Sequence, residues 1–326
     1  MARIFSGVQP SGSLHLGNYI GAFRQWVEGQ KADDAIFCVV DLHALTVETT
    51  PELLRTRTLE TAAGLLAVGL DPALCTIFLQ SHVAEHAQLS WLLECTAYDG
   101  ELRRMTQFKE KSRGQAAVRA GLYTYPTLMA ADILLYDTDR VPVGEDQRQH
   151  IELTRDLALR FNAAYGETFV VPEIELPRVG ARVMDLQHPR KKMAKSTASP
   201  AGTISIDDAP EEIERKIRRA VTDAETEVRY DRDRKPGVSN LLELLAVATD
   251  ESPERLAARY DSYGALKADV AGAVVELLRP ARERYVEIVG DPAAIGEVLR
   301  KGAERARAIA AVTLARAQRA IGLVTP

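Results

Sequence analysis

The sequence contains few cysteines, and their spacing argues against two common ways of holding a fold together. Cys38, Cys75 and Cys95 are the only cysteines among 326 residues. They are odd in number and far apart, and no CxxC or mixed Cys/His spacing accompanies them, so we expect neither a disulfide framework nor a zinc site. Cys38 and Cys75 stand in apolar runs, where a free cysteine behaves as a small hydrophobic residue.

Long apolar runs and an excess of positive charge are also missing. The N-terminal stretch MARIFSGVQPSGS lacks the apolar segment of a secretion signal, and no run reaches the roughly 20 residues that a membrane-spanning helix needs. We therefore expect a protein of the reducing cytoplasm that has no membrane contact. The formal net charge is -5, so any contact with nucleic acid must depend on local basic patches.

Short apolar runs alternate with helical patterns in the first half of the chain. This alternation predicts an α/β fold with a parallel sheet covered on both faces, and such folds bind ligands beyond the carboxyl ends of their strands. Strands are expected at residues 3–8, 35–41, 75–81 and 140–144, and helices at residues 15–29, 50–72 and 145–162.

Two of these helices carry clear local signals. In the first, Tyr19, Phe23 and Trp26 recur at steps of four and three residues, which places them on one face. In the second, Thr50 stands where an N-cap is needed and Pro51 occupies the first helical position.

The composition changes at about Ile206, after which only helical patterns follow. We therefore expect a parallel-sheet domain over residues 1–206 and an all-helical domain over residues 207–326, whose last helix is a candidate to pack back on the first domain. The stretch HPRKKMAKSTASPAG, residues 188–202, lies at this boundary and carries four cations. Its composition fits a linker, an address tag or a mobile clamp for a polyphosphate, and does not decide among them.

The stretch QPSGSLHLGN, residues 9–18, joins the first expected strand to the first expected helix. The start of a helix offers unpaired backbone N–H groups and the positive end of a dipole, which suits a phosphate. Gly12 and Gly17 leave room for a nucleotide, and His15 and Asn18 add donors. An ordinary strand–helix turn explains the same letters, and the spacing alone leaves both interpretations open.

The stretch YPTLMAADILLY, residues 125–136, places a single carboxylate in an apolar segment. On a helix, Tyr125, Met129, Asp132 and Tyr136 share one face. A buried, unpartnered carboxylate costs several kcal/mol, so Asp132 must face solvent, pair with a cation such as a nearby arginine, or meet a donor of a ligand. A sulfur and an aromatic ring on its face suit a flat ring, and a carboxylate beside them can accept an indole N–H.

Two short motifs resemble the signatures of class I aminoacyl-tRNA synthetases. HLGN at 15–18 is similar to the first signature, His-Ile-Gly-His, and KMAKS at 192–196 is similar to the second, Lys-Met-Ser-Lys-Ser. Further stretches resemble the bacterial tryptophanyl-tRNA synthetases over nearly the whole chain: IFSGVQPSG, GELRRMTQFKEKS, YPTLMAADILLY, PVGEDQRQHIELTRDLALRFN, GARVMDL and KPGVSNLLEL.

This resemblance implies a tryptophan–tRNA ligase built on a Rossmann-type catalytic domain. The catalytic domain would include a connecting insertion near residues 100–125 and the KMAKS loop, and residues 207–326 would bind the tRNA anticodon. The implied substrates are L-tryptophan, ATP and tRNA(Trp). Mg²⁺ would arrive on the ATP oxygens, with no dedicated protein site, and the protein would act as a homodimer.

The resemblance also implies roles for individual residues. Catalytic roles fall on Lys192, Lys195, Lys111 and His15. The tryptophan site is implied at Asp132, Tyr125, Met129, Gln147 and His43. ATP contacts are implied at Gln9, Pro10, Ser11, Gly17, Asn18, Gly144, Glu145, Asp146, Val183, Lys192, Met193, Ala194, Lys195 and Ser196. Candidate cations for RNA are Arg215, Lys216, Arg218, Arg219, Lys301, Arg305 and Arg307.

Simpler explanations compete with several of these roles. Glu145 in the first turn of a helix is a routine capping residue, Lys111 suits a solvated loop, and each RNA candidate suits a solvated helix face. At the level of function, the rivals are a related enzyme with another substrate, such as tyrosine or a nucleotide, and a paralogue that binds tRNA without charging it. The second rival draws on Ala194, which stands where the family usually has serine.

Overall fold

The computed structural model describes residues 1–10, 14–114, 117–175, 183–193 and 200–324. Within them, a parallel sheet has the strand order β3-β2-β1-β4-β5. The strands are β1 (Arg3–Val8), β2 (Asp34–Val39), β3 (Thr76–Leu79), β4 (Arg140–Pro142) and β5 (Glu173–Glu175). The α/β fold and the four predicted strands are confirmed. The short β5 was not predicted, because its sequence EIE lacks the apolar run that marks a buried strand.

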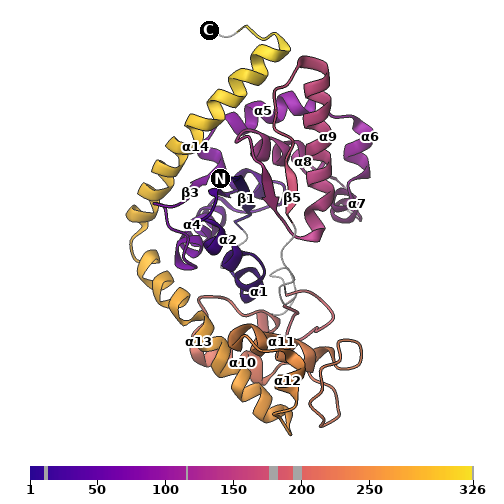
Figure 1. Cartoon of the computed structure of the whole chain (residues 1–326), viewed down its shortest axis with the longest axis vertical. Coiled ribbons are helices and arrows are strands. Elements are labelled where there is room, and N and C mark those ends of the chain that lie inside the picture. Colours follow the sequence, from indigo (N-terminus) through magenta and orange to yellow (C-terminus); the bar gives the residue numbers. More distant parts are fainter. Residues whose placement is uncertain (11–13, 115–116, 176–182, 194–199, 325–326) are drawn as a thin grey trace.

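Helices cover both faces of this sheet (Figure 1). Those of the first part of the chain are α1 (Leu16–Asn18), η1 (Tyr19–Phe23), α2 (Arg24–Gly29), α3 (Asp41–Ala44), α4 (Pro51–Ala67), η2 (Gln80–His82), α5 (Glu85–Glu94), α6 (Asp99–Arg104), α7 (Thr106–Ser112), α8 (Ala120–Leu134), η3 (Glu145–Gln147) and α9 (Arg148–Tyr165). Those of the last part are η4 (Pro200–Gly202), α10 (Pro210–Arg218), α11 (Pro236–Thr249), α12 (Pro253–Ala257), α13 (Tyr263–Val289) and α14 (Pro292–Ile321).

Local signals decide most helix starts. The Thr50 hydroxyl accepts from the backbone N–H of Leu53 at 3.3 Å, and Pro51 follows at the first position of α4, as predicted. The helix predicted over residues 15–29 is interrupted by a π-helical turn, η1, although Phe23 and Trp26 are buried as its spacing predicts. The helix predicted from residue 145 begins as a 3-10 turn and becomes α-helical only at α9.

The two long C-terminal helices also contact the first part of the chain. The long helix α13 packs on α4, and α14 runs back along the first part of the chain, where it packs on β3 and α5 (Figure 1). At Gly302 of α14 an added Cβ would lie 1.7 Å from the carbonyl oxygen of Ile77, so glycine allows the helix to touch the edge strand. Among the described residues, no helix is both long and apolar enough to cross a membrane.

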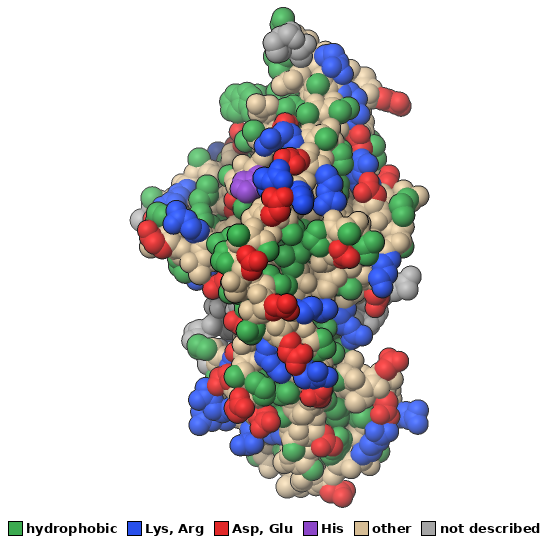
Figure 2. All heavy atoms as spheres, turned by 90° about the vertical axis from the view of Figure 1, so that its left-hand side faces the viewer, with side chains coloured by type: hydrophobic (Ala, Val, Ile, Leu, Met, Phe, Trp, Pro, Cys, Tyr) green, Lys and Arg blue, Asp and Glu red, His purple; other side chains and the backbone are tan. Residues whose placement is uncertain are grey.

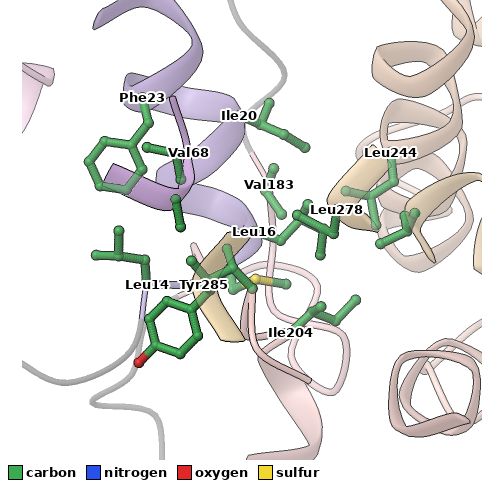
Figure 3. Close-up of a cluster of buried hydrophobic side chains, with 14 of the residues drawn as sticks. Leu14, Leu16, Ile20, Phe23, Val68, Val183, Ile204, Leu244, Leu278 and Tyr285 are labelled. Carbon is green, nitrogen blue, oxygen red and sulfur yellow. The ribbon is translucent and has the colours of Figure 1, made fainter. Parts of the chain in front are cut away.

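One apolar cluster joins the N-terminal and C-terminal parts. Leu14 and Leu16, which stand on either side of the N-cap His15, belong to the same buried cluster as Val183, Ile204 and Leu278 of α13 (Figure 3). Two backbone hydrogen bonds strengthen this junction, from Leu16 N–H to the Ile204 carbonyl (2.8 Å) and from Ile206 N–H to the Leu14 carbonyl (2.9 Å). The turn after β1 is therefore held against the segment that leads into the helical part.

Candidate active site

A cavity of about 280 Å³ opens beyond the carboxyl ends of β1 and β4. These two strands are neighbours in the sheet although they are not consecutive in the chain, so the strand order reverses between them. Open α/β sheets bind their ligands at such a reversal. The residues lining this cavity, the strand-end cavity, are Phe5, Ser6, Gly7, Gln9, Val40, His43, Thr46, Gln107, Lys111, Tyr125, Met129, Asp132, Ile133, Val141, Val143 and Gln147.

The structure gathers the residues predicted for tryptophan around this one cavity. All five of them line it: Asp132, Tyr125, Met129, Gln147 and His43. Lys111 and Gln9, which the sequence assigns to other roles, line it too. The fourth residue of the predicted helix face, Tyr136, lies beyond the end of α8 and is fully buried against the ring of Phe5, with ring centroids 5.4 Å apart.

Asp132 lies at the base of the strand-end cavity and is 1% exposed. Its Oδ1 accepts from Gln80 Nε2 at 2.6 Å and from His86 Nδ1 at 2.6 Å, and its Oδ2 accepts from His43 Nε2 at 2.8 Å. Two of the explanations offered above, exposure to solvent and pairing with an arginine, are therefore wrong. Burial alone would raise the pKa of Asp132, but the imidazoles of His43 and His86 hold this pKa well below its usual value.

The three donors leave the Asp132 carboxylate one open acceptor position. A carboxylate offers about four lone-pair sites, two on each oxygen. Both sites on Oδ1 are occupied, whereas Oδ2 has a single described partner, His43. Because the charged group is also held in one orientation, it can take one further N–H donor from within the strand-end cavity.

Gln80 and His86 were not predicted as part of the site. Gln80 is fully buried and receives a hydrogen bond from the backbone N–H of Leu42 to its Oε1 at 3.1 Å, which orients its amide N–H groups toward Asp132. His86 is also fully buried, and its second ring nitrogen lies 2.7 Å from the hydroxyl of Tyr136. The sequence offered one signal for Gln80: it directly follows an apolar strand, and α/β proteins bind their ligands beyond the carboxyl ends of such strands.

Tyr125 and Lys111 also line the strand-end cavity. The Tyr125 hydroxyl lies 2.7 Å from His150 Nε2 and 3.2 Å from Gln107 Oε1. The Lys111 ammonium donates to Gln107 Oε1 at 3.1 Å and lies 5.8 Å from the centre of the Tyr125 ring. Burial raises the pKa of Tyr125 to about 12. Burial, helped by the charges of Lys111 and His43, lowers the pKa of His150 to about 4, so this imidazole is neutral at pH 7.

The turn after β1 holds the ordinary helix cap that the simpler interpretation expects. His15 Nδ1 accepts from the backbone N–H of Asn18, and Asn18 Oδ1 accepts from the backbone N–H of His15, each at 3.3 Å. Gly17 faces the start of the KMAKS motif: an added Cβ would lie 3.0 Å from the His15 ring and 3.6 Å from Met193 Cβ. Gly17 of the first motif therefore lies against Met193 of the second, although Asn18 and Lys192, the facing ends of the two motifs, are 174 positions apart in the sequence.

The segment around Val183 pairs with the start of the KMAKS motif. Met193 N–H donates to the Val183 carbonyl at 3.0 Å, and Met184 and Lys192 form an antiparallel bridge. Met193 is buried in the apolar cluster that joins the N-terminal and C-terminal parts, whereas Lys192 is exposed. The remaining predicted residues of this loop, Ala194, Lys195 and Ser196, lie outside the described residues, as does Ser11.

The other predicted nucleotide residues lie on or near the strand ends. Gln9 Nε2 donates to the His43 carbonyl at 3.1 Å, and Pro10 beside it is buried. Gly144 approaches Asp146 closely, since an added Cβ would lie 2.6 Å from Asp146 Oδ1. The remaining contacts are those of an ordinary first turn: Glu145 pairs with Arg148 at 2.6 Å, and Gln147 Nε2 donates to Asp146 Oδ2 at 2.9 Å.

Several cations predicted for RNA are engaged within the chain. Lys216 is buried and pairs with Asp208 at 2.6 Å, so its assignment to an RNA-facing surface is wrong. Arg305 and Arg307 belong to α14 and donate to backbone carbonyls of the first part of the chain, at Pro72 and His82. They therefore lie away from the other helices of the predicted anticodon domain. Three more of these cations, Arg215, Arg218 and Lys301, each pair with an acidic residue on the same helix.

Comparison with known proteins places this arrangement in one family. Residues 1–279 match the family described as tRNA synthetases class I (W and Y), and the chain belongs to that family. It is 56% identical to tryptophan–tRNA ligase 1 of Streptomyces coelicolor, over 100% of this chain and 98% of that protein. It is 51% identical to the tryptophan–tRNA ligase of Bacillus subtilis, over 98% of this chain and 97% of that protein.

Solved structures resemble the whole chain as well. The tryptophanyl-tRNA synthetase of Mycoplasma pneumoniae superimposes with a TM-score of 0.89 and 37% identity, covering 99% of this chain and 98% of the other. The enzyme from Campylobacter jejuni, complexed with ADP and tryptophan, gives a TM-score of 0.87 and 36% identity over 98% and 100% of the two chains.

Proposed function

We propose that this protein activates L-tryptophan with ATP and joins it to tRNA(Trp). The observation that carries the proposal is the buried carboxylate of Asp132, which three donors orient toward the strand-end cavity with one acceptor position open. An indole N–H is a donor only and satisfies that position. A phenyl ring has no donor to offer, so the buried carboxylate would lose a partner, which is how such sites reject analogues.

In the first step, the tryptophan carboxylate attacks the α-phosphorus of ATP and the bond to the β-phosphate breaks, which releases pyrophosphate and leaves tryptophanyl-adenylate. The protein supplies no nucleophile, so its contribution is positioning and charge stabilisation. Lys192, Lys195, Lys111 and His15 are proposed to stabilise the charge on the leaving pyrophosphate. Mg²⁺ is proposed to travel on the ATP oxygens, because hydrated Mg²⁺ favours substrate phosphates over protein cages.

In the second step, the terminal ribose hydroxyl of the tRNA attacks the adenylate carbonyl and AMP leaves. We propose that residues 1–206 form the catalytic domain and that the helices after residue 207 meet the anticodon. Of the candidates on and after α10, Arg215, Arg218 and Arg219 are exposed, and Arg215 and Arg218 also pair with acidic neighbours on that helix. The face along α13 and α14 mixes Lys and Arg with Asp and Glu and has no purely basic stripe (Figure 2), so it is a poor candidate for the RNA surface.

We also propose that the protein acts as a homodimer in the cytoplasm. Leu45, Val47 and Trp91 are 51%, 60% and 64% exposed, and they line two adjoining shallow hollows beside the strand-end cavity. A second copy of the chain that covers this apolar surface would contact Tyr125, because Tyr125 lines both the hollow that contains Trp91 and the strand-end cavity. Three free cysteines suit a reducing compartment.

Pyrophosphate exchange with each of the twenty amino acids tests the proposed activity. Exchange that depends on tryptophan alone supports it. Exchange that depends on tyrosine, or none at all, overturns it, and the second result favours the paralogue that binds tRNA without charging it.

The variant Lys195→Ala tests the proposed chemistry. It should slow adenylate formation at least tenfold more than it weakens tryptophan binding, because a lysine that acts on the departing pyrophosphate stabilises the transition state and not the bound amino acid. Stopped-flow or exchange kinetics and equilibrium binding of tryptophan measure the two effects. Equal losses in both would show that Lys195 acts in ground-state binding.

A further inference from the structure

The motif KPGVSN, residues 235–240, opens α11 and has no part in the steps above. Close contacts of Lys235 and Gly237 fix the position of the first turn of this helix. Lys235 is buried and pairs with Glu225 at 2.6 Å and with Asp223 at 3.2 Å. Two residues later an added Cβ on Gly237 would lie 2.1 Å from the carbonyl oxygen of Val221, so the backbones touch there and only glycine fits. The first turn of α11 therefore has a fixed position.

The last residue of the motif, Asn240, holds the backbone of one distant residue at both of its polar groups. Asn240 Oδ1 accepts from the N–H of Met184 at 2.9 Å, and Asn240 Nδ2 donates to the carbonyl of Met184 at 3.0 Å. The side chain is 2% exposed. One carboxamide thus replaces the two hydrogen bonds that a neighbouring strand would supply, at a place where water cannot take over.

The opposite edge of the same segment pairs with residues 191–193. Met193 N–H donates to the Val183 carbonyl at 3.0 Å, and Asp185 N–H donates to the Lys191 carbonyl at 2.9 Å. The segment 183–185 therefore lies between Asn240 on one edge and the start of the KMAKS motif on the other. A shift of this segment would move both the backbone of Val183, which is assigned to the ATP site, and the backbone of Lys192, the first lysine of the KMAKS motif.

We propose that Asn240 is a positioning residue for the nucleotide step: its two-point bond to Met184 sets the place of the Val183 and Lys192 backbones relative to ATP. This inference rests on the proposed function for its kinetic test. It extends that function, since it gives the helical part of the chain a role in amino-acid activation that is separate from RNA contact.

A second asparagine provides a matched control. Asn162, near the end of α9, holds a backbone in the same manner, with Nδ2 donating to the Phe169 carbonyl at 2.8 Å and Oδ1 accepting from the N–H groups of Thr168 and Phe169 at 3.0 and 2.9 Å. The substitution Asn162→Ala removes an equivalent clamp, but none of its partners lines the strand-end cavity or pairs with residues 183–193.

The experiment compares Asn240→Ala, Asn162→Ala and the unaltered protein in tryptophan-dependent pyrophosphate exchange. Asn240→Ala should lower kcat/KM for ATP about ten- to hundredfold, the range that small misplacement of reacting groups produces, and should change the binding of tryptophan alone less than twofold. Asn162→Ala should leave both within twofold. Equal ATP kinetics in the two variants, or parallel losses for ATP and tryptophan, would overturn the proposal.

Hydrogen exchange provides a readout that does not need activity. Asn240→Ala should speed exchange in the peptide covering residues 183–193, and Asn162→Ala should not; unchanged protection there would overturn the clamp itself. If Asn240→Ala does not fold, Asn240→Asp serves, because it keeps the acceptor for Met184 N–H but sets an oxygen against the Met184 carbonyl. If the unaltered protein activates no amino acid, the proposed function fails, while the exchange experiment still decides whether Asn240 holds the segment.

Discussion

Replacing Asp132 by asparagine tests the part of the site that sets the choice of amino acid. The variant keeps the shape of the side chain but has one acceptor oxygen and one N–H₂ group in place of two acceptor oxygens. The oxygen can keep the donors Gln80 and His86, which both bind Oδ1. The new N–H₂ group then replaces Oδ2, where it faces His43 on one side and the strand-end cavity on the other.

The magnitude follows from that arrangement. An indole N–H that met an acceptor would now meet a donor, so the hydrogen bond to a charged group, worth about 1.5–3 kcal/mol, is lost. At 1.4 kcal/mol for each factor of ten, tryptophan binding should weaken about 10- to 150-fold. Phenylalanine makes no such bond, so its weak activation should change little, and the preference for tryptophan over phenylalanine should fall by a similar factor.

Pyrophosphate exchange with tryptophan and with phenylalanine measures this ratio, and thermal unfolding checks that the variant is folded. The matched control is Asp41→Asn, since Asp41 also accepts two hydrogen bonds at the end of a strand, from the backbone N–H and hydroxyl of Ser81, but does not line the cavity. A folded Asp132→Asn variant with an unchanged ratio would refute the reasoning, as would an equal change in the Asp41→Asn control.

Two further predictions concern stability. Gly302→Ala should lower the free energy of unfolding by at least about 2 kcal/mol, because its Cβ would overlap the Ile77 carbonyl. Gly296→Ala on the same helix meets nothing within 4 Å and should raise the free energy of unfolding by about 0.5–1 kcal/mol. Equal effects of the two substitutions in urea unfolding would contradict the packing of α14 on β3. Burial lowers the pKa of His150 to about 4 in the folded protein, whereas the unfolded chain binds this proton at the ordinary pKa of about 6.5. The free energy of unfolding therefore decreases as the pH is lowered from about 6.5 to about 4. Between pH 7 and pH 4.5, the free energy of unfolding of His150→Gln should therefore fall by roughly 2–3 kcal/mol less than that of the unaltered protein. Identical pH profiles in urea unfolding would contradict the burial of a neutral His150.

The elements that were predicted well are those with a strong local pattern. The two apolar strands near residues 36 and 77 consist almost wholly of buried side chains, β1 buries its three central residues, and Thr50 with Pro51 marks the start of α4. β5 was missed because it is three residues long with a glutamate at each end. The π-helical turn at residues 19–23 was missed because its buried side chains keep nearly the same spacing as those of an α-helix.

The candidate site divides in the same way. Asp132 was noticed because it is the one charge in an apolar helix, and that local contrast predicts a buried site without naming its partners. The partners come from segments 46, 52 and 89 residues away along the chain, and no spacing in the sequence connects them. Lys216 shows the reverse error, since a lysine on a helix with acidic neighbours has the pattern of a surface cation, yet tertiary packing buries it against Asp208.

The sequence by itself determined the order of strands and helices, the change to an all-helical pattern after Ile206, and the residue types available for chemistry, because periodicity and caps act over a few neighbouring residues. Only the tertiary structure decided which donors surround Asp132, which cations remain exposed, and that Asn240 holds Met184. Those contacts depend on the strand order and on how α11 and α14 pack against the sheet domain, and hydrogen bonds between groups so far apart in the chain form only once that packing has brought them together.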